Sequence, residues 1–137
     1  MLTGALPSGH RKACPLSDGS VSATPGTDKN GPLALITSAA QALDTVRYGS
    51  NHLNLKFHPS AIAGIAGARN LLALIKSYMD MGGSHIQFNV VSSDTLRKAK
   101  ESPDEYRDLT VRVAGFSAYF TRLHEGVQDE IIARTEH

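Results

Sequence analysis

The chain has 137 residues, which fits a single domain, and 41% of them are hydrophobic while 20% are charged, which excludes a disordered, collagen-like or disulfide-scaffold chain. The net charge of +1 creates no strong field, and no apolar run approaches the roughly 20 residues that span a bilayer, so we expect neither nucleic acid nor a membrane as a partner. Cys14 is the only cysteine and cannot form an internal disulfide, and no secretory signal precedes it, so we expect a cytoplasmic location.

The first segment, residues 1–31, is predicted to be a loop-rich arm. Residues 1–32 contain five glycines and four prolines, and their apolar residues follow neither a helical nor an alternating period. Two interpretations stay open. The arm is either a disordered linker or an irregular segment pinned to a larger body by Leu6, Leu16 and Val21.

A helix over 32–45 and a strand over 51–57 follow. Pro32 suits a first helical turn. The apolar residues that recur at helical spacing after it are Leu33, Ile36, Ala40 and Leu43. In the next segment Leu53, Leu55 and Phe57 alternate with Asn54 and Lys56, which is typical of a half-buried strand beginning at Asn51.

A second helix is predicted over 61–81, with Ser60 as its N-cap. Gly64 and Gly67 weaken its first half, so we expect the firm helix to begin near Ala68. Its predicted inward face consists of Ile65, Leu72, Ile75 and Met79. Gly82 and Gly83 supply the left-handed stop.

The last third alternates strands and helices. The clearest strand is 84–91, in which Ile86, Phe88 and Val90 lie opposite Gln87 and Asn89. A short helix capped by Ser92, Ser93 or Asp94 runs through Lys100 and ends before Pro103. The final elements are a strand over 108–113, with Leu109, Val111 and Val113 opposite Thr110 and Arg112, and a helix over 126–135 with Val127 and Ile131 inward. This order predicts an α/β fold.

Ordinary catalytic motifs are absent from the sequence. The histidines lack the short separations of zinc motifs; they are His10, His52, His58, His85, His124 and His137. We therefore predict no metal site. Cys14 is interpreted as a bystander thiol in the arm, and residues 26–31 as a turn rather than a phosphate cradle, because no GKS or GKT sequence follows.

Gly115 stands out because of its neighbours. A single glycine after a strand is usually a turn residue. The run from Asp108 to Phe120, however, reads DLTVRVAGFSAYF and closely resembles the radical-bearing loop of glycyl radical enzymes, whose pattern is R-V-A/S-G-Y/F. Residues 114–118 look closer to the dehydratase, lyase and decarboxylase branch than to the formate acetyltransferase branch.

The resemblance covers the chain from about Thr3 to its end. GGSHIQFNVV at 82–91 looks like the strand before the loop, residues 94–97 and 102–106 look like its connecting segment, and 128–135 look like the last helix of the family. Three stretches of the arm resemble upstream loop signatures: 5–9, 15–19 and 26–32. The resemblance implies that 1–31 continues a missing upstream barrel, that 32–137 is a glycine-radical domain, and that the whole is the C-terminal portion of a glycyl radical enzyme barrel.

The resemblance also implies a chemistry. Gly115 would store a stable backbone radical, installed by a radical S-adenosylmethionine activating enzyme and passed to a cysteine in the missing barrel portion. No metal is implied in this chain. The full enzyme is expected to be a homo-oligomer in the cytoplasm or a bacterial microcompartment. Cys14 does not match the family's cysteine loop and receives no thiyl role.

Further expectations concern the neighbours of Gly115. Those expected to pack around it and exclude water and oxygen are Arg112, Val113, Ala114, Phe116 and Ser117. For Arg112, a buried or capped guanidinium and a surface ion pair both stay open. We assign His58 and Gln87 structural roles rather than contacts with substrate.

Three functions compete. The leading hypothesis is the radical-carrying part of a glycyl radical lyase that is not competent for turnover alone. The alternative is a stand-alone spare part that rescues an oxygen-damaged enzyme, and the third is a remnant in which Gly115 is only a turn. If the chain is such a part, we expect the apolar stripes at Leu53, Phe88 and Val111 to face the absent barrel.

Overall fold

The computed structural model describes residues 4–7, 9, 11–14, 16–19, 21–24, 26–42, 44–49 and 52–137. Its elements in chain order are α1 Gly31–Ala42, α2 Thr45–Tyr48, β1 Leu53–Phe57, the 3-10 helix η1 Pro59–Ile62, α3 Gly64–Asp80, β2 Ile86–Val90, α4 Ser93–Glu101, β3 Thr110–Arg112, β4 Ser117–Tyr119, the 3-10 helix η2 Phe120–Arg122 and α5 Glu125–Ala133. The mixed helix-and-strand fold expected from the sequence is confirmed. His10, Leu43 and Asn51 lie outside the described residues.

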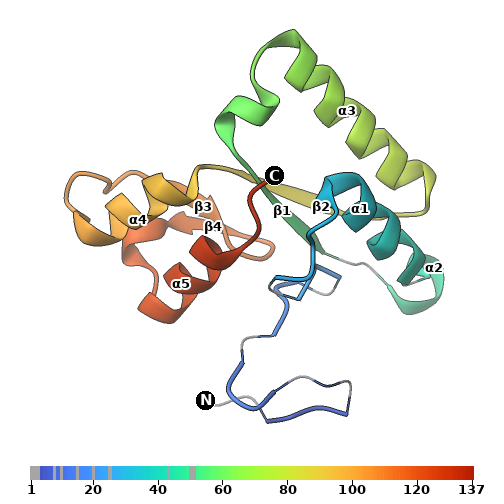
Figure 1. Ribbon diagram of the computed structural model, residues 1–137, viewed down its shortest axis with the longest axis horizontal. Coiled ribbons are helices and arrows are strands. Elements are labelled where there is room, and N and C mark those ends of the chain that lie inside the picture. Colours follow the sequence, from blue (N-terminus) through green and yellow to red (C-terminus); the bar gives the residue numbers. More distant parts are fainter. Residues whose placement is uncertain are drawn as a thin grey trace.

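The centre of the molecule is a parallel pair of strands. β1 pairs with β2 in a register that sets Leu53 opposite Ile86 and Phe57 opposite Val90. Parallel strands need a crossover connection, and α3 supplies it. Figure 1 shows α1 and α3 on one side of these strands and α4, α5 and the β3–β4 hairpin on the other.

Two apolar cores flank the strands. The first joins α1, β1 and α3 through Ile36, Ala39, Leu53, Leu55, Phe57 and Tyr78. The second joins α4, the hairpin and α5 through Val91, Leu96, Ala99, Val111, Phe120 and Ile131. The expectation that Leu53 and Val111 face an absent barrel is therefore wrong, since both are buried in the chain's own cores, and Phe88 is partly buried against the first.

The structure differs from the prediction in which faces of the two strands are buried. We expected β1 to be half-buried, but all five of its residues are buried, including Lys56 at 1% exposure. On β2 the polar Gln87 and Asn89 are buried, whereas Val90 is 48% exposed. The reason is that the hairpin and α5 cover the polar face of the pair, as the contacts below show.

The predicted helix over 32–45 corresponds to α1, which is shorter, and a separate short helix follows it. α1 ends at Ala42 and α2 begins at Thr45, because the Asp44 carboxylate accepts hydrogen bonds from the amides of Val46 and Arg47 and so caps a new helix. Ile36 is buried as expected, but Leu33 is exposed.

The predicted inward face of α3 is wrong for three of its four residues, and Ile75 is partly buried. Ile65, Leu72 and Met79 are exposed; the face that packs on the first core carries Leu71, Leu74 and Tyr78. Gly67 sets this rotation, because a Cβ there would lie 2.3 Å from the backbone of Ile62. The helix begins at Gly64 rather than near Ala68 as predicted.

The remaining boundaries agree more closely. The predicted cap is an exception: Ser60 does not cap α3, whose N-cap is Ala63 without a side-chain capping bond, and His58 caps the preceding η1. Ser92 caps α4 and Gly82 has the expected positive φ. α5 begins one residue before the prediction and buries Ile131. Among the described residues, no helix is long and apolar enough to cross a membrane.

Candidate functional site

Gly115 lies in the four-residue connection, residues 113–116, between β3 and β4. Arg112 pairs with Ser117 across the hairpin, and the amide of Val113 donates to the carbonyl of Phe116 over 2.9 Å. Gly115 has φ +80, in the left-handed region that favours glycine. We call residues 113–116 the glycine loop.

Three carboxamide side chains hold the glycine loop and the strand before it. Asn54, Gln87 and Asn89 lie on the polar face of β1 and β2, and we call them the amide layer. Asn89 both donates to the carbonyl and accepts from the amide of Arg112, each over 2.7 Å. The Asn54 amide group donates to Asp18 over 2.9 Å and to the carbonyl of Val113 over 3.4 Å.

Gln87 reaches the glycine itself. Its Oε1 accepts from Arg112 Nε over 2.5 Å and from the Gly115 amide over 3.4 Å. Arg112 also donates to the hydroxyl of Ser117 over 3.1 Å. Of the two interpretations left open for Arg112, the structure supports a capped guanidinium, and Gln87 makes structural contacts within the chain.

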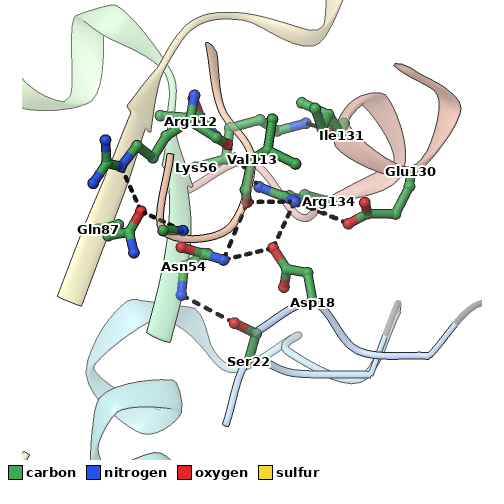
Figure 2. Close-up of polar contacts among 12 residues, drawn as sticks. Asp18, Ser22, Asn54, Lys56, Gln87, Arg112, Val113, Glu130, Ile131 and Arg134 are labelled. Atoms are coloured by element: carbon green, nitrogen blue, oxygen red, sulfur yellow. Dashed lines mark hydrogen bonds and ion pairs between the residues drawn. The ribbon is translucent and has the colours of Figure 1, made fainter. Parts of the chain in front are cut away.

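Arg134 ties the loop to the rest of the molecule. This residue follows α5, and its side chain is 10% exposed. The guanidinium donates to the carbonyls of Arg112 and Val113 over 3.2 and 3.1 Å. It also forms ion pairs with Asp18 over 2.7 Å and with Glu130 over 3.0 Å. Figure 2 shows how this guanidinium joins the arm, the hairpin and the last helix.

The second half of the arm belongs to the site. Besides the Asp18 contacts, Ser22 Oγ accepts from the amide of Asn54 over 3.0 Å. Val21 packs against the first core, so the pinned interpretation is correct there, whereas Leu6 and Leu16 are exposed. The division of the chain at residue 31 stays a prediction.

Lys56 is a buried cation on the same face. Its Nζ donates to Ser93 Oγ and to the carbonyl of Ile132 over 2.9 Å each, and to the carbonyl of Ile131 over 3.4 Å. These carbonyls end α5, where a positive charge is favourable. Burial lowers the pKa of Lys56 to about 8. Burial opposes ionisation of Glu136 too, but hydrogen bonds from Ser93 and the charge of Lys56 bring the pKa of Glu136 below its ordinary value.

The other candidate groups do not form a second centre. Within the described part of the chain, no three histidine, cysteine, aspartate or glutamate side chains gather as metal ligands would. His58 Nδ1 contacts Ser60 and accepts from its amide, which is the structural role we expected. Cys14 is exposed in the arm.

The outer side of the glycine loop is open. We expected its side chains to exclude water, but Ala114, Gly115 and Ser117 are exposed and Phe116 is 56% exposed. Only the inner side, toward the amide layer, is covered by this chain. That expectation is wrong for the chain by itself, because the side chains of the turn point away from the strands that hold its backbone.

Sequence reasoning missed the residues that hold the loop. Asn54, Asn89, Asp18 and Arg134 received no role from the sequence. One signal was available: the polar positions of the two strands are three carboxamides and one lysine. A carboxamide carries both a hydrogen-bond donor and an acceptor, as a backbone peptide group does. It can therefore pair with the amide and the carbonyl of a backbone segment that packs against it.

The fold and the site together define a small α/β domain that presents one glycine on a hairpin. The glycine radical family model matches residues 17–121, and the chain belongs to this family. Among its relatives, indoleacetate decarboxylase from Tractidigestivibacter scatoligenes is 54% identical over 99% of this chain. The 4-hydroxyphenylacetate decarboxylase glycyl radical subunit from Clostridioides difficile is 50% identical over 98%.

The structure is similar to a solved relative as well. The B12-independent glycerol dehydratase from Clostridium butyricum, with glycerol bound, matches 98% of the chain with a TM-score of 0.91 and 46% identity. The chain spans about 15% of the length of each decarboxylase and 17% of the dehydratase. These relatives place it in the dehydratase, lyase and decarboxylase branch of the family.

Proposed function

We propose that Gly115 stores a backbone radical and that the chain is the radical-bearing part of a glycyl radical lyase, of the decarboxylase or dehydratase type. The observation that carries the proposal is the backbone of Gly115. It lies within the residues matched by the family model, on a turn with open space on one side and a buried polar layer on the other.

The φ angle of Gly115 gives a physical reason for glycine. A radical at Cα is stabilised when its half-filled orbital overlaps the amide nitrogen, which requires an extended, planar backbone. At φ +80 the residue is about 100° from that geometry, and the intervening region of positive φ is open essentially to glycine alone. Any other residue would be hindered on the way to the planar state.

The proposed chemistry has two steps. The Cα–H bond of Gly115 breaks homolytically, and the hydrogen atom passes to a carbon radical derived from S-adenosylmethionine in an activating enzyme, leaving one unpaired electron on Cα. In the second step, Cα takes a hydrogen atom from a cysteine thiol in a barrel portion, which restores the Cα–H bond and leaves a thiyl radical.

The open side of the loop supports such encounters, since Gly115 and its neighbours are exposed and His52 Nε2, at 4.0 Å, is the nearest atom to the position of a Cβ. The spare-part alternative is not favoured, because the similarity to the relatives extends over the arm as well as the glycine loop. A homo-oligomeric, cytoplasmic enzyme remains part of the proposal.

Anaerobic electron paramagnetic resonance tests the proposal. The chain is incubated with a radical S-adenosylmethionine activating enzyme of this branch and S-adenosylmethionine. We expect a doublet from the single α-hydrogen, which collapses when the glycines are deuterated at Cα and is absent in Gly115→Ala. Admission of air should cleave the chain at Gly115, as seen by mass spectrometry. No doublet in the wild-type chain, or a doublet that survives in Gly115→Ala, would overturn the proposal.

A further inference from the structure

We propose that Gln87 is a positioning residue for Gly115: its side-chain oxygen holds the Gly115 N–H and so fixes the peptide on the amino side of the proposed radical carbon. This inference rests on the proposed function, because it says how the site is held. Within the part of the chain that the structure describes, Gln87 is the acceptor of that N–H: the backbone bond of the turn joins Val113 and Phe116 and does not involve the amide of Gly115.

The position of Gln87 is itself tightly determined. The side chain is 7% exposed and lies on β2, in register with Asn54 of β1. Arg112 Nε donates to Oε1 over 2.5 Å, so the oxygen is fixed from one side by a cation. On the other side Gln87 Nε2 lies 3.4 Å from His85 Nε2. The Gly115 N–H therefore donates to an oxygen atom whose position is already fixed by the hydrogen bond from Arg112.

The two sides of Gly115 are thus held differently. The nitrogen side is tied to β2 through Gln87, whereas the carbonyl side leads to Phe116, whose own carbonyl closes the hairpin onto Val113. Rotation about the N–Cα bond toward the planar state must therefore move the carbonyl side while the Ala114–Gly115 peptide stays in place. At 3.4 Å the Gln87 bond is long for N–H···O, so it guides the peptide without locking the loop.

The amide signal of Gly115 tests this contact in the 137-residue chain without any radical. In a spectrum of the chain labelled with ¹⁵N-glycine, Gln87→Leu removes the acceptor at nearly constant size. We expect the Gly115 amide proton to move upfield and to exchange with solvent about five-fold faster, the factor that corresponds to the loss of about 1 kcal/mol. Gln87→Glu retains an oxygen acceptor beside Arg112 and should restore slow exchange.

A matched control separates positioning from general loosening. Gln128 is also 7% exposed, and its amide group donates to the carbonyl of Phe120, away from the glycine loop. Gln128→Leu should leave the Gly115 signal unchanged. The amide of the buried Gly67, which donates to the carbonyl of Ala63 at the start of α3, reports on the folding of every variant in the same spectrum. Equal exchange at Gly115 in wild type and Gln87→Leu, with Gly67 protected in both, would overturn the inference.

The activated chain gives a second readout. Without the Gln87 acceptor the Ala114–Gly115 peptide is free to rotate away from the planar state that stabilises the radical, so we expect the doublet of Gln87→Leu to decay about five-fold faster in anaerobic buffer than that of wild type, and Gln87→Glu to decay at the wild-type rate. If wild type forms no radical, the proposed function fails while the amide test still decides whether Gln87 holds Gly115. If wild type forms one and both readouts are unchanged in Gln87→Leu, only the positioning role fails.

Discussion

Gly115→Ala should lower the free energy of unfolding by about 1 kcal/mol while leaving the fold intact. An alanine at φ +80 costs about 1–2 kcal/mol in strain, and the stiffer unfolded chain returns about 0.4–1 kcal/mol of that. Steric hindrance adds nothing, because the new Cβ would meet only His52 Nε2, at 4.0 Å.

Gly82→Ala is the matched control for this prediction. Gly82 has φ +95 and nothing within 4 Å of its Cβ position, but it follows the C-cap of α3 and is not part of the glycine loop. Both variants should melt about 4 °C below wild type by circular dichroism, and urea unfolding should give equal losses. Only Gly115→Ala should fail to form the radical doublet.

Two results would refute this reasoning. A loss above about 3 kcal/mol for Gly115→Ala, with the control near 1 kcal/mol, would mean that the turn is sterically closed and that loss of the radical reflects misfolding. A stability equal to wild type would mean that the residue does not hold a left-handed φ, and the argument from the planar radical would lose its starting geometry.

Three further predictions follow from buried groups elsewhere in the chain. Arg134→Met should cost about 3 kcal/mol in urea unfolding, because it leaves the carboxylate of Asp18 buried without its cation; a loss below 1 kcal/mol would contradict the ion-pair assignment. Lys56 has a folded pKa of about 8 against 10.5, so the unfolded chain binds more protons between these values and stability should rise with pH across that window, by at most about 3 kcal/mol relative to Lys56→Met; a parallel pH profile of the two proteins would contradict it. Gly83→Ala should cost about 1–3 kcal/mol in thermal unfolding, because its Cβ would lie 2.4 Å from the buried ring of Tyr78, and an unchanged melting temperature would show that the ring can move aside.

Local patterns predicted the elements well and their burial poorly. The alternation around Phe88 located β2, and the cap at Ser92 located α4, because both signals are contained within a few residues. The side of each element that is covered depends on partners distant in the sequence. Ile65 and Leu72 have helical spacing, yet Gly67 turns the opposite face of α3 to the core.

The site was predicted in part for the same reason. Gly115 could be singled out because the residues around it resemble a known loop. The residues that hold it could not, since Asn54, Asn89 and Arg134 each follow a pattern that usually means exposure to water. They are buried because the hairpin packs across the polar face of β1 and β2. The alternation of residues within a strand does not indicate which distant segment packs on either face.

The two apolar cores have a consequence for how the molecule folds. The first uses residues from Val21 to Phe88 and the second those from Val91 to Ile132, so each core is assembled from a continuous length of chain. Between them lies a layer held by directional hydrogen bonds rather than by interlocking apolar side chains. The losses of unfolding free energy caused by substitutions in opposite cores should therefore add. Each core, with the length of chain that builds it, can form as its own cooperative unit before the hydrogen-bonded layer joins the two.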